Sequence, residues 1–155
     1  MKMDSFVERD YSLEQMMPLI KECLRENKTV KFSPRGTSML PMIRQGIDCV
    51  VLSAVPGKLN KFDLPLYQRA NGQYVLHRIV KVGETYTCIG DNQFELEKGV
   101  RQDQLIAVMV GFTRAGKKYS ADHVLYRLYC RFWHYSRPVR SFWLRGIGWL
   151  RRHLK

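Results

Sequence analysis

The chain of 155 residues is long enough for one domain with its own hydrophobic core. Its 45% hydrophobic and 26% charged residues are typical of a folded globular protein and exclude a disordered one. The net charge of +12 is uneven, because residues 123–155 contain seven arginines and one lysine but no acidic residue. The basic character therefore belongs to this C-terminal segment and has to be explained there.

Two further properties of the sequence set expectations for compartment and cofactors. The first ten residues carry both acidic and basic side chains, unlike a secretory leader, and the chain has no run of about 18 apolar residues. We therefore expect a cytoplasmic protein. The four cysteines form no CxxC pair, so we expect reduced structural thiols and neither a metal nor another cofactor.

The first predicted element is a helix that starts at Ser12. Ser12 and Gln15 have the spacing of a capping box. The apolar residues that follow recur on one helical face, at Leu13, Met16, Met17, Ile20 and Leu24. Pro18 lies inside this pattern and can kink the helix, because it removes a backbone donor. We expect the helix to end at Asn27 and Lys28, which makes residues 1–28 an N-terminal helical segment.

Residues 29–115 have the pattern of a β domain. Short runs rich in β-branched and aromatic residues alternate with turn residues, at 30–32, 48–53, 64–69, 73–82, 86–89 and 105–112. Asn71 and Gly72 separate two of these runs, and both tolerate the positive φ of a tight hairpin. Many short strands at this spacing predict a barrel-like or folded-over sheet.

Residues 116–155 predict a pair of cationic amphipathic helices. The first apolar stripe consists of Val124, Leu125, Leu128, Tyr129, Phe132 and Trp133. Ser136 to Pro138 interrupt the pattern. The second stripe consists of Val139, Phe142, Trp143, Ile147, Leu150 and Leu154.

Three interpretations of this tail, counted from residue 123 to residue 155, stay open. The stripes can pack on the β domain or on a partner. They can lie at an anionic membrane surface, because tryptophan and phenylalanine among arginines suit the headgroup boundary. The arginines can also contact nucleic-acid phosphates. The aromatic residues favour lipid, and no recognition-helix signature supports nucleic acid.

Five segments occur in an order that resembles a known family. They are 37–41 (Thr-Ser-Met-Leu-Pro), 45–50, 61–67, 75–80 (Val-Leu-His-Arg-Ile-Val) and 89–93 (Ile-Gly-Asp-Asn-Gln). Together they resemble the S24/S26 peptidases, and most of all the signal peptidase I branch that uses histidine as its base, the ER and archaeal type. The resemblance covers residues 33–112. It implies a signal-peptidase/LexA-like folded β-sheet and a serine endopeptidase that cleaves a specific peptide or leader through an acyl-enzyme.

The resemblance assigns the catalytic roles, and the local sequence agrees with them. It makes Ser38 the nucleophile, His77 the base, and Asp91 the group that orients His77. A serine hydroxyl needs such a base, and imidazole titrates near neutrality. Ser38 lies between Gly36 and Pro41, in a segment that is neither regular helix nor strand and can present a side chain. His77 lies in a strand, so its neighbours in sequence should face the other way.

Further residues complete the predicted site. The substrate-binding and oxyanion residues are Gly36, Thr37, Met39 and Pro41, with Met39 and Leu40 lining a pocket for an apolar substrate side chain. Structural support is assigned to Asp63, Arg78 and Asn92. The substrate is expected to be a peptide or precursor protein.

The chain departs from the family pattern in four ways. Gly36 stands where many relatives have a hydroxyl residue, so the oxyanion hole would consist of backbone N–H groups, including that of Ser38. Ile89 replaces a lysine, and Phe62 replaces the glycine before Asp63. No segment resembles the N-terminal membrane anchor of signal peptidases. We therefore expect a compact cytoplasmic-side relative with a narrower substrate range, located peripherally on the inner membrane face.

Two alternatives remain from the sequence. The first is a catalytically inactive peptide- or membrane-binding module with the same fold. The second, which the sequence favours less, is a nucleic-acid-associated regulator built around the basic tail.

Overall fold

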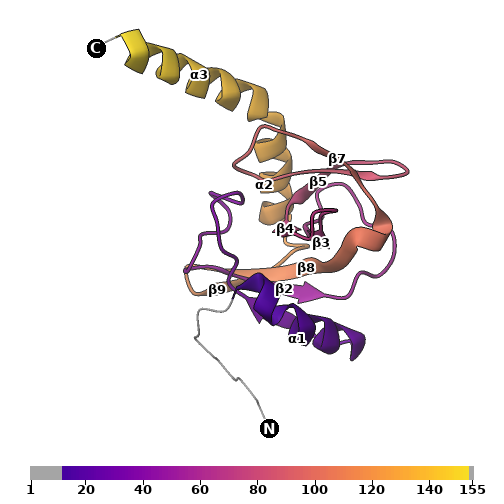
Figure 1. Cartoon of the computed structure of the whole chain (residues 1–155). Helices are drawn as coiled ribbons and strands as arrows, with labels where there is room; N and C mark the ends of the chain where they lie inside the picture. The colour runs from indigo at the N-terminus through magenta and orange to yellow at the C-terminus, as the bar shows by residue number, and fades with distance from the viewer. Residues whose placement is uncertain (1–11, 154–155) are drawn as a thin grey trace.

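The computed structural model describes residues 12–153, and Figure 1 shows their course. Residues 1–11 of the expected N-terminal segment lie outside this range, as do Leu154 and the side chain of Leu150 from the second expected stripe. The described chain is mainly β, with two antiparallel sheets and three α-helices.

The N-terminal helix α1 (Leu13–Arg25) forms as its sequence predicts. The Ser12 hydroxyl accepts the Gln15 N–H at 3.3 Å, and the Gln15 side chain accepts the Ser12 N–H at 2.9 Å, which closes the capping box. Met17, Ile20 and Leu24 are buried in the main core. Pro18 is accommodated within the helix, and Asn27 follows its end with a φ of 56°.

The larger sheet is built around one long strand, β8 (Leu105–Arg114). Its order is β1 (Val30–Phe32), β2 (Cys49–Ser53), β8, β3 (Pro65–Gln68) and β4 (Tyr74–Leu76), and β9 (Lys117–Ser120) also pairs with β8. Val108 pairs with Ser53 of β2 and with Pro65 of β3, so these two strands lie on opposite edges of β8. The Asn71–Gly72 turn joins β3 to β4, which confirms the predicted hairpin.

The smaller sheet consists of β5 (Arg78–Val82), β6 (Tyr86–Ile89) and β7 (Glu97–Val100). The run at 73–82, expected as one strand, is divided at His77 between the two sheets. The reason is that Leu76 packs in the core of the larger sheet, whereas Ile79 packs in a second core with Tyr67 and Cys88. Two strands were not expected, β7 and β9, and β9 extends the β domain beyond residue 115. A short 3-10 helix (Gln102–Gln104) leads into β8.

The two C-terminal helices, α2 (Val124–Tyr135) and α3 (Arg137–His153), confirm the expected pair and its break at Ser136. The packing face of α2 differs from the expected stripe. Tyr126 and Cys130 are buried in the core, whereas Leu125, Leu128 and Phe132 are exposed. Figure 1 shows α2 lying against the β domain and α3 projecting away from it. None of the described helices is both long and apolar enough to cross a bilayer.

Candidate functional site

Ser38 lies in a turn-rich loop between β1 and β2 that is held by two sets of hydrogen bonds. On one side, the Gly36 N–H donates to the Gln45 side chain at 2.8 Å. On the other, the Arg114 guanidinium donates to the carbonyls of Pro41 and Met42, each at 2.6 Å. The loop therefore has a defined course, and its half-buried Ser38 has a fixed position on the domain.

The Gly90-Asp91-Asn92 turn is seated directly on the Ser38 loop. The Asn92 N–H donates to the Ser38 carbonyl at 2.8 Å, and the Asn92 side-chain amide donates to the Thr37 carbonyl at 3.2 Å. A Cβ at Gly90 would lie 2.6 Å from the Ser38 carbonyl oxygen, closer than real contacts allow. Glycine is therefore required at residue 90 because the two backbones touch there.

His77 lies at the junction between β4 and β5 and is only 4% exposed. Its Nδ1 is 3.5 Å from the Tyr67 hydroxyl and 3.7 Å from Oε2 of Glu97. The Tyr67 hydroxyl donates to the same Glu97 oxygen at 2.6 Å, and Arg69 bonds both carboxylate oxygens at 2.8 and 2.7 Å. His77 therefore faces a connected tyrosine, glutamate and arginine.

This arrangement selects one tautomer of His77. Since the Tyr67 proton goes to Glu97, the groups beside Nδ1 are acceptors, and they favour a proton on Nδ1. The lone pair is then on Nε2, for which the described residues provide no hydrogen-bond partner. A histidine in this form can take a proton through Nε2.

Burial lowers the pKa of His77, and the nearby Arg69 charge lowers it further, while Glu97 opposes both effects. The imidazole is therefore neutral at and above its ordinary pKa of about 6.5. Glu97 itself has a lowered pKa: burial acts against ionisation, but the bonds from Arg69 and Tyr67 outweigh it. Neutral imidazole beside an ionised carboxylate is the protonation state that a general base requires.

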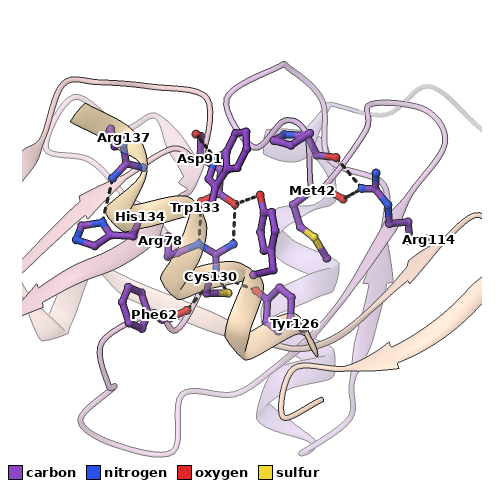
Figure 2. A network of polar contacts seen from close by, with 12 residues as sticks. Met42, Phe62, Arg78, Asp91, Arg114, Tyr126, Cys130, Trp133, His134 and Arg137 are labelled. Carbon is purple, nitrogen blue, oxygen red and sulfur yellow. Dashed lines mark hydrogen bonds and ion pairs between the residues drawn. The ribbon is translucent and has the colours of Figure 1, made fainter. Parts of the chain in front are cut away.

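Asp91, expected to orient His77, is bonded to Arg78 instead (Figure 2). Its two oxygens accept from Arg78 at 2.8 and 2.7 Å, and both residues are almost completely buried. Tyr129 donates to the Asp91 carboxylate at 3.3 Å, and Trp133 donates to its backbone carbonyl at 2.7 Å. Asp91 thus joins the Gly90–Asn92 turn to β5 and α2, and the carboxylate beside His77 is Glu97.

The third guanidinium nitrogen of Arg78, Nη1, does not contact Asp91 and bonds other groups. It donates to the Tyr126 hydroxyl at 2.9 Å, to the Cys130 sulfur at 3.0 Å and to the Phe62 carbonyl at 3.1 Å. These bonds explain why α2 turns Tyr126 and Cys130 inward instead of its most apolar stripe: a buried arginine needs polar partners. The supporting role expected for Arg78 agrees with these contacts.

The other predicted site residues divide into two groups. Met39 is buried in the main core, so it packs the loop onto the domain and does not line a substrate pocket. Gly36, Thr37 and Pro41 are exposed around Ser38. The Gly36 N–H is occupied by Gln45, whereas no acceptor among the described residues bonds the Ser38 N–H. The oxyanion role expected for the Ser38 N–H stays a prediction.

Asp63 has a local structural role. Its carboxylate accepts the Asn60 N–H at 2.8 Å, and its backbone carbonyl accepts the Ile79 N–H at 2.9 Å. Phe62, the residue before Asp63, has a φ of 79°, a conformation that favours glycine. Its ring lies edge-on to His134 and Tyr135, with centroids 5.6 and 6.4 Å away. These contacts help to hold the unusual backbone.

The site residues missed by the sequence analysis are Tyr67, Arg69 and Glu97. The predicted hairpin contained a signal for Tyr67, because its register pairs Tyr67 with Val75, two residues before His77. Glu97 gave no such signal, since β7 was not expected. A groove of about 560 Å³ beside α1 is lined by Arg69 and by Lys21, Arg25 and Arg101, but not by Ser38 or His77. We therefore do not assign this groove to the site.

The described residues contain no cluster of three or more histidine, cysteine, aspartate or glutamate side chains placed to hold a metal ion. The chain was compared with models of protein families, with curated proteins and with solved structures, and none of the three comparisons gave a match.

Proposed function

We propose that this chain is a serine endopeptidase of the signal-peptidase-like type, with Ser38 as nucleophile and His77 as base. The observation that carries the proposal is the direct seating of the Ser38 loop on the Gly90–Asn92 turn. Arg78, the residue next to His77, pairs with Ile89 and bonds Asp91 of the same turn. These contacts therefore link segments of three of the motifs behind the family resemblance, although the residues they join are up to 55 apart in sequence. Among the described residues no hydrogen bond joins the Ser38 hydroxyl to His77, whose contacts are Tyr67 and Glu97.

The proposed reaction passes through an acyl-enzyme. Nε2 of His77 takes the Ser38 hydroxyl proton as the oxygen attacks the peptide carbonyl, and the Ser38 N–H stabilises the oxyanion. The peptide C–N bond then breaks, and His77 returns the proton to the leaving amine. Water attacks the ester with His77 again as base, which releases the carboxylate product and restores Ser38. Tyr67 and Glu97 hold Nδ1 throughout.

The first test of this proposal is the formation of new peptide N-termini. Wild type, Ser38→Ala and His77→Ala are incubated with a peptide library, and the products are identified by N-terminal labelling and mass spectrometry. We expect cleavage by wild type and a loss of at least about a hundredfold in each variant. The matched controls are Ser53→Ala on β2 and His123→Gln at the start of α2, which should cut as wild type does.

The contact between the Ser38 loop and the Gly90–Asn92 turn can be tested separately. Gly90→Ala places a Cβ 2.6 Å from the Ser38 carbonyl and should displace the loop, which lowers cleavage at least about tenfold. The control is Gly83→Ala, where the nearest atom would be 3.6 Å away, an ordinary contact. If wild type binds library peptides without cutting any, the proposal fails and the alternative of an inactive peptide-binding module replaces it.

A further inference from the structure

Helix α3 carries an apolar face that the described part of the protein leaves exposed. Val139, Phe142, Trp143 and Ile147 recur at helical spacing, and Phe142 and Trp143 are 77% and 67% exposed. Single exposed apolar residues are common on proteins, but a contiguous face of this kind usually marks an interaction surface. Figure 1 shows that α3 extends away from the β domain, which leaves this apolar face accessible.

The start of α3 is nevertheless fixed to the body of the protein. The Arg140 guanidinium stacks 3.7 Å from the centroid of the Trp133 ring on α2 and donates to the Trp133 carbonyl at 2.8 Å. It also lies 5.9 Å from the Phe94 ring, which follows the Gly90–Asn92 turn. The first turn of α3 is thus attached to α2, and the rest of the helix projects from this attachment.

The charge of α3 complements an anionic partner. Arg137, Arg140 and Arg145 belong to it, and residues 123–155 contain no acidic side chain at all. On a helical projection Arg140 and Arg145 lie on either side of the apolar face. An apolar face bordered by arginines is the pattern of a helix that lies in a membrane interface, with its ring side chains at the acyl boundary and its cations among the phosphates.

We propose that α3 binds parallel to the surface of an anionic lipid bilayer through Val139, Phe142, Trp143 and Ile147. A second copy of the chain would oppose one arginine-rich helix with another, which like-charge repulsion disfavours. Nucleic acid would neutralise the arginines but leave the apolar face in water. A bilayer with anionic headgroups satisfies both the charge and the apolar surface. This inference does not depend on the peptidase activity.

The test is flotation of the full-length protein with vesicles of phosphatidylcholine alone or mixed with phosphatidylglycerol. We expect the partition coefficient to be at least about tenfold higher on the phosphatidylglycerol vesicles and to fall with added salt. Phe142→Glu should lower binding at least about tenfold, and Arg145→Gln about fivefold on the anionic vesicles only. The matched control is Leu19→Glu, which places the same charge at an exposed apolar residue of α1.

Several results would overturn the inference. One is an absence of binding to both kinds of vesicle, and another is equal loss of binding with Leu19→Glu and Phe142→Glu. A dimer in solution that Phe142→Glu converts to a monomer would assign the face to a second copy. Duplex DNA binding stronger than vesicle binding would assign the tail to nucleic acid. Because Phe142 is exposed, unfolding of the variant is not expected, and a thermal melt checks this.

Discussion

Two carboxylates, Asp91 and Glu97, lie in the neighbourhood of His77, and each is bonded by an arginine at both oxygens. Asp91 is 1% exposed and its partner Arg78 is 2% exposed, with α2 closed over them. The Glu97 side chain is 26% exposed, and besides Arg69 it contacts Tyr67 and His77. The two ion pairs therefore differ in burial and in the residues they contact: the Arg78–Asp91 pair stabilises the fold, whereas Glu97 of the other pair acts on the pKa of His77.

The largest expected effect is on the buried pair. Arg78→Met keeps an extended side chain but leaves the Asp91 carboxylate buried without its partner, which should lower the free energy of unfolding by about 3–5 kcal/mol. Urea denaturation followed by circular dichroism measures this. Arg69→Met, at the more exposed pair, should cost about 1 kcal/mol or less. Equal losses in the two variants would remove the distinction between the pairs.

Glu97→Gln should change the pKa of His77 more than it changes the stability of the fold. Since Glu97 raises the pKa of His77, the variant should show a lower His77 pKa, which an NMR titration of the imidazole measures without any substrate. If the chain is a peptidase, cleavage should also fall at least about tenfold, because Nδ1 loses its ionised neighbour. An unchanged His77 pKa would show that Glu97 does not act on this histidine.

The lowered pKa of His77 also predicts a pH dependence of stability. The pKa of His77 in the folded protein lies below its unfolded value of about 6.5. At a pH between these two pKa values, the unfolded state therefore binds more protons than the folded state. The contribution of His77 to the free energy of unfolding should therefore be constant above about pH 6.5 and decrease as the pH falls below this value. His77→Gln should remove this contribution, which unfolding at a series of pH values detects. A greater loss at high pH would contradict the assignment.

A paired tyrosine substitution makes a finer comparison. Tyr129→Phe removes a donor to Asp91 and should lower stability by about 1 kcal/mol without changing the His77 tautomer. Tyr67→Phe removes the hydroxyl between Glu97 and His77, and should shift the imidazole from the Nδ1–H form toward a mixture. Nitrogen chemical shifts of His77 report the tautomer. A tautomer change in Tyr129→Phe alone would reverse the roles of the two networks.

The smallest expected effect concerns Phe62. Phe62→Gly releases a backbone strain of about 1–3 kcal/mol but loses the ring contacts to His134 and Tyr135. These effects oppose each other, so we expect a change in unfolding free energy of about 1 kcal/mol or less. The control Phe62→Ala loses the ring without gaining glycine's freedom and should be less stable than Phe62→Gly. The reverse order would mean that the strain is not significant.

Local sequence determined several parts of this protein. The capping box at Ser12, the Asn71–Gly72 hairpin and the break at Ser136 each formed as predicted. Each depends only on residues that are close in the chain. A preferred φ angle or a hydrogen bond at a helix end determines the local structure there, and a short stretch of sequence is enough to predict it. The order of the motifs likewise selected Ser38 and His77 as the residues to test.

The tertiary structure alone decided which groups surround His77 and Asp91. The partner of Asp91 depends on where β5 and α2 place Arg78, and the neighbour of His77 depends on β7, which has no clear strand pattern in the sequence. Likewise, α2 turns Tyr126 and Cys130 inward because the buried Arg78 needs hydrogen-bond partners, and its most apolar stripe stays largely exposed. Contacts between distant segments depend on burial and hydrogen-bond satisfaction across the whole fold, and no single segment contains that information.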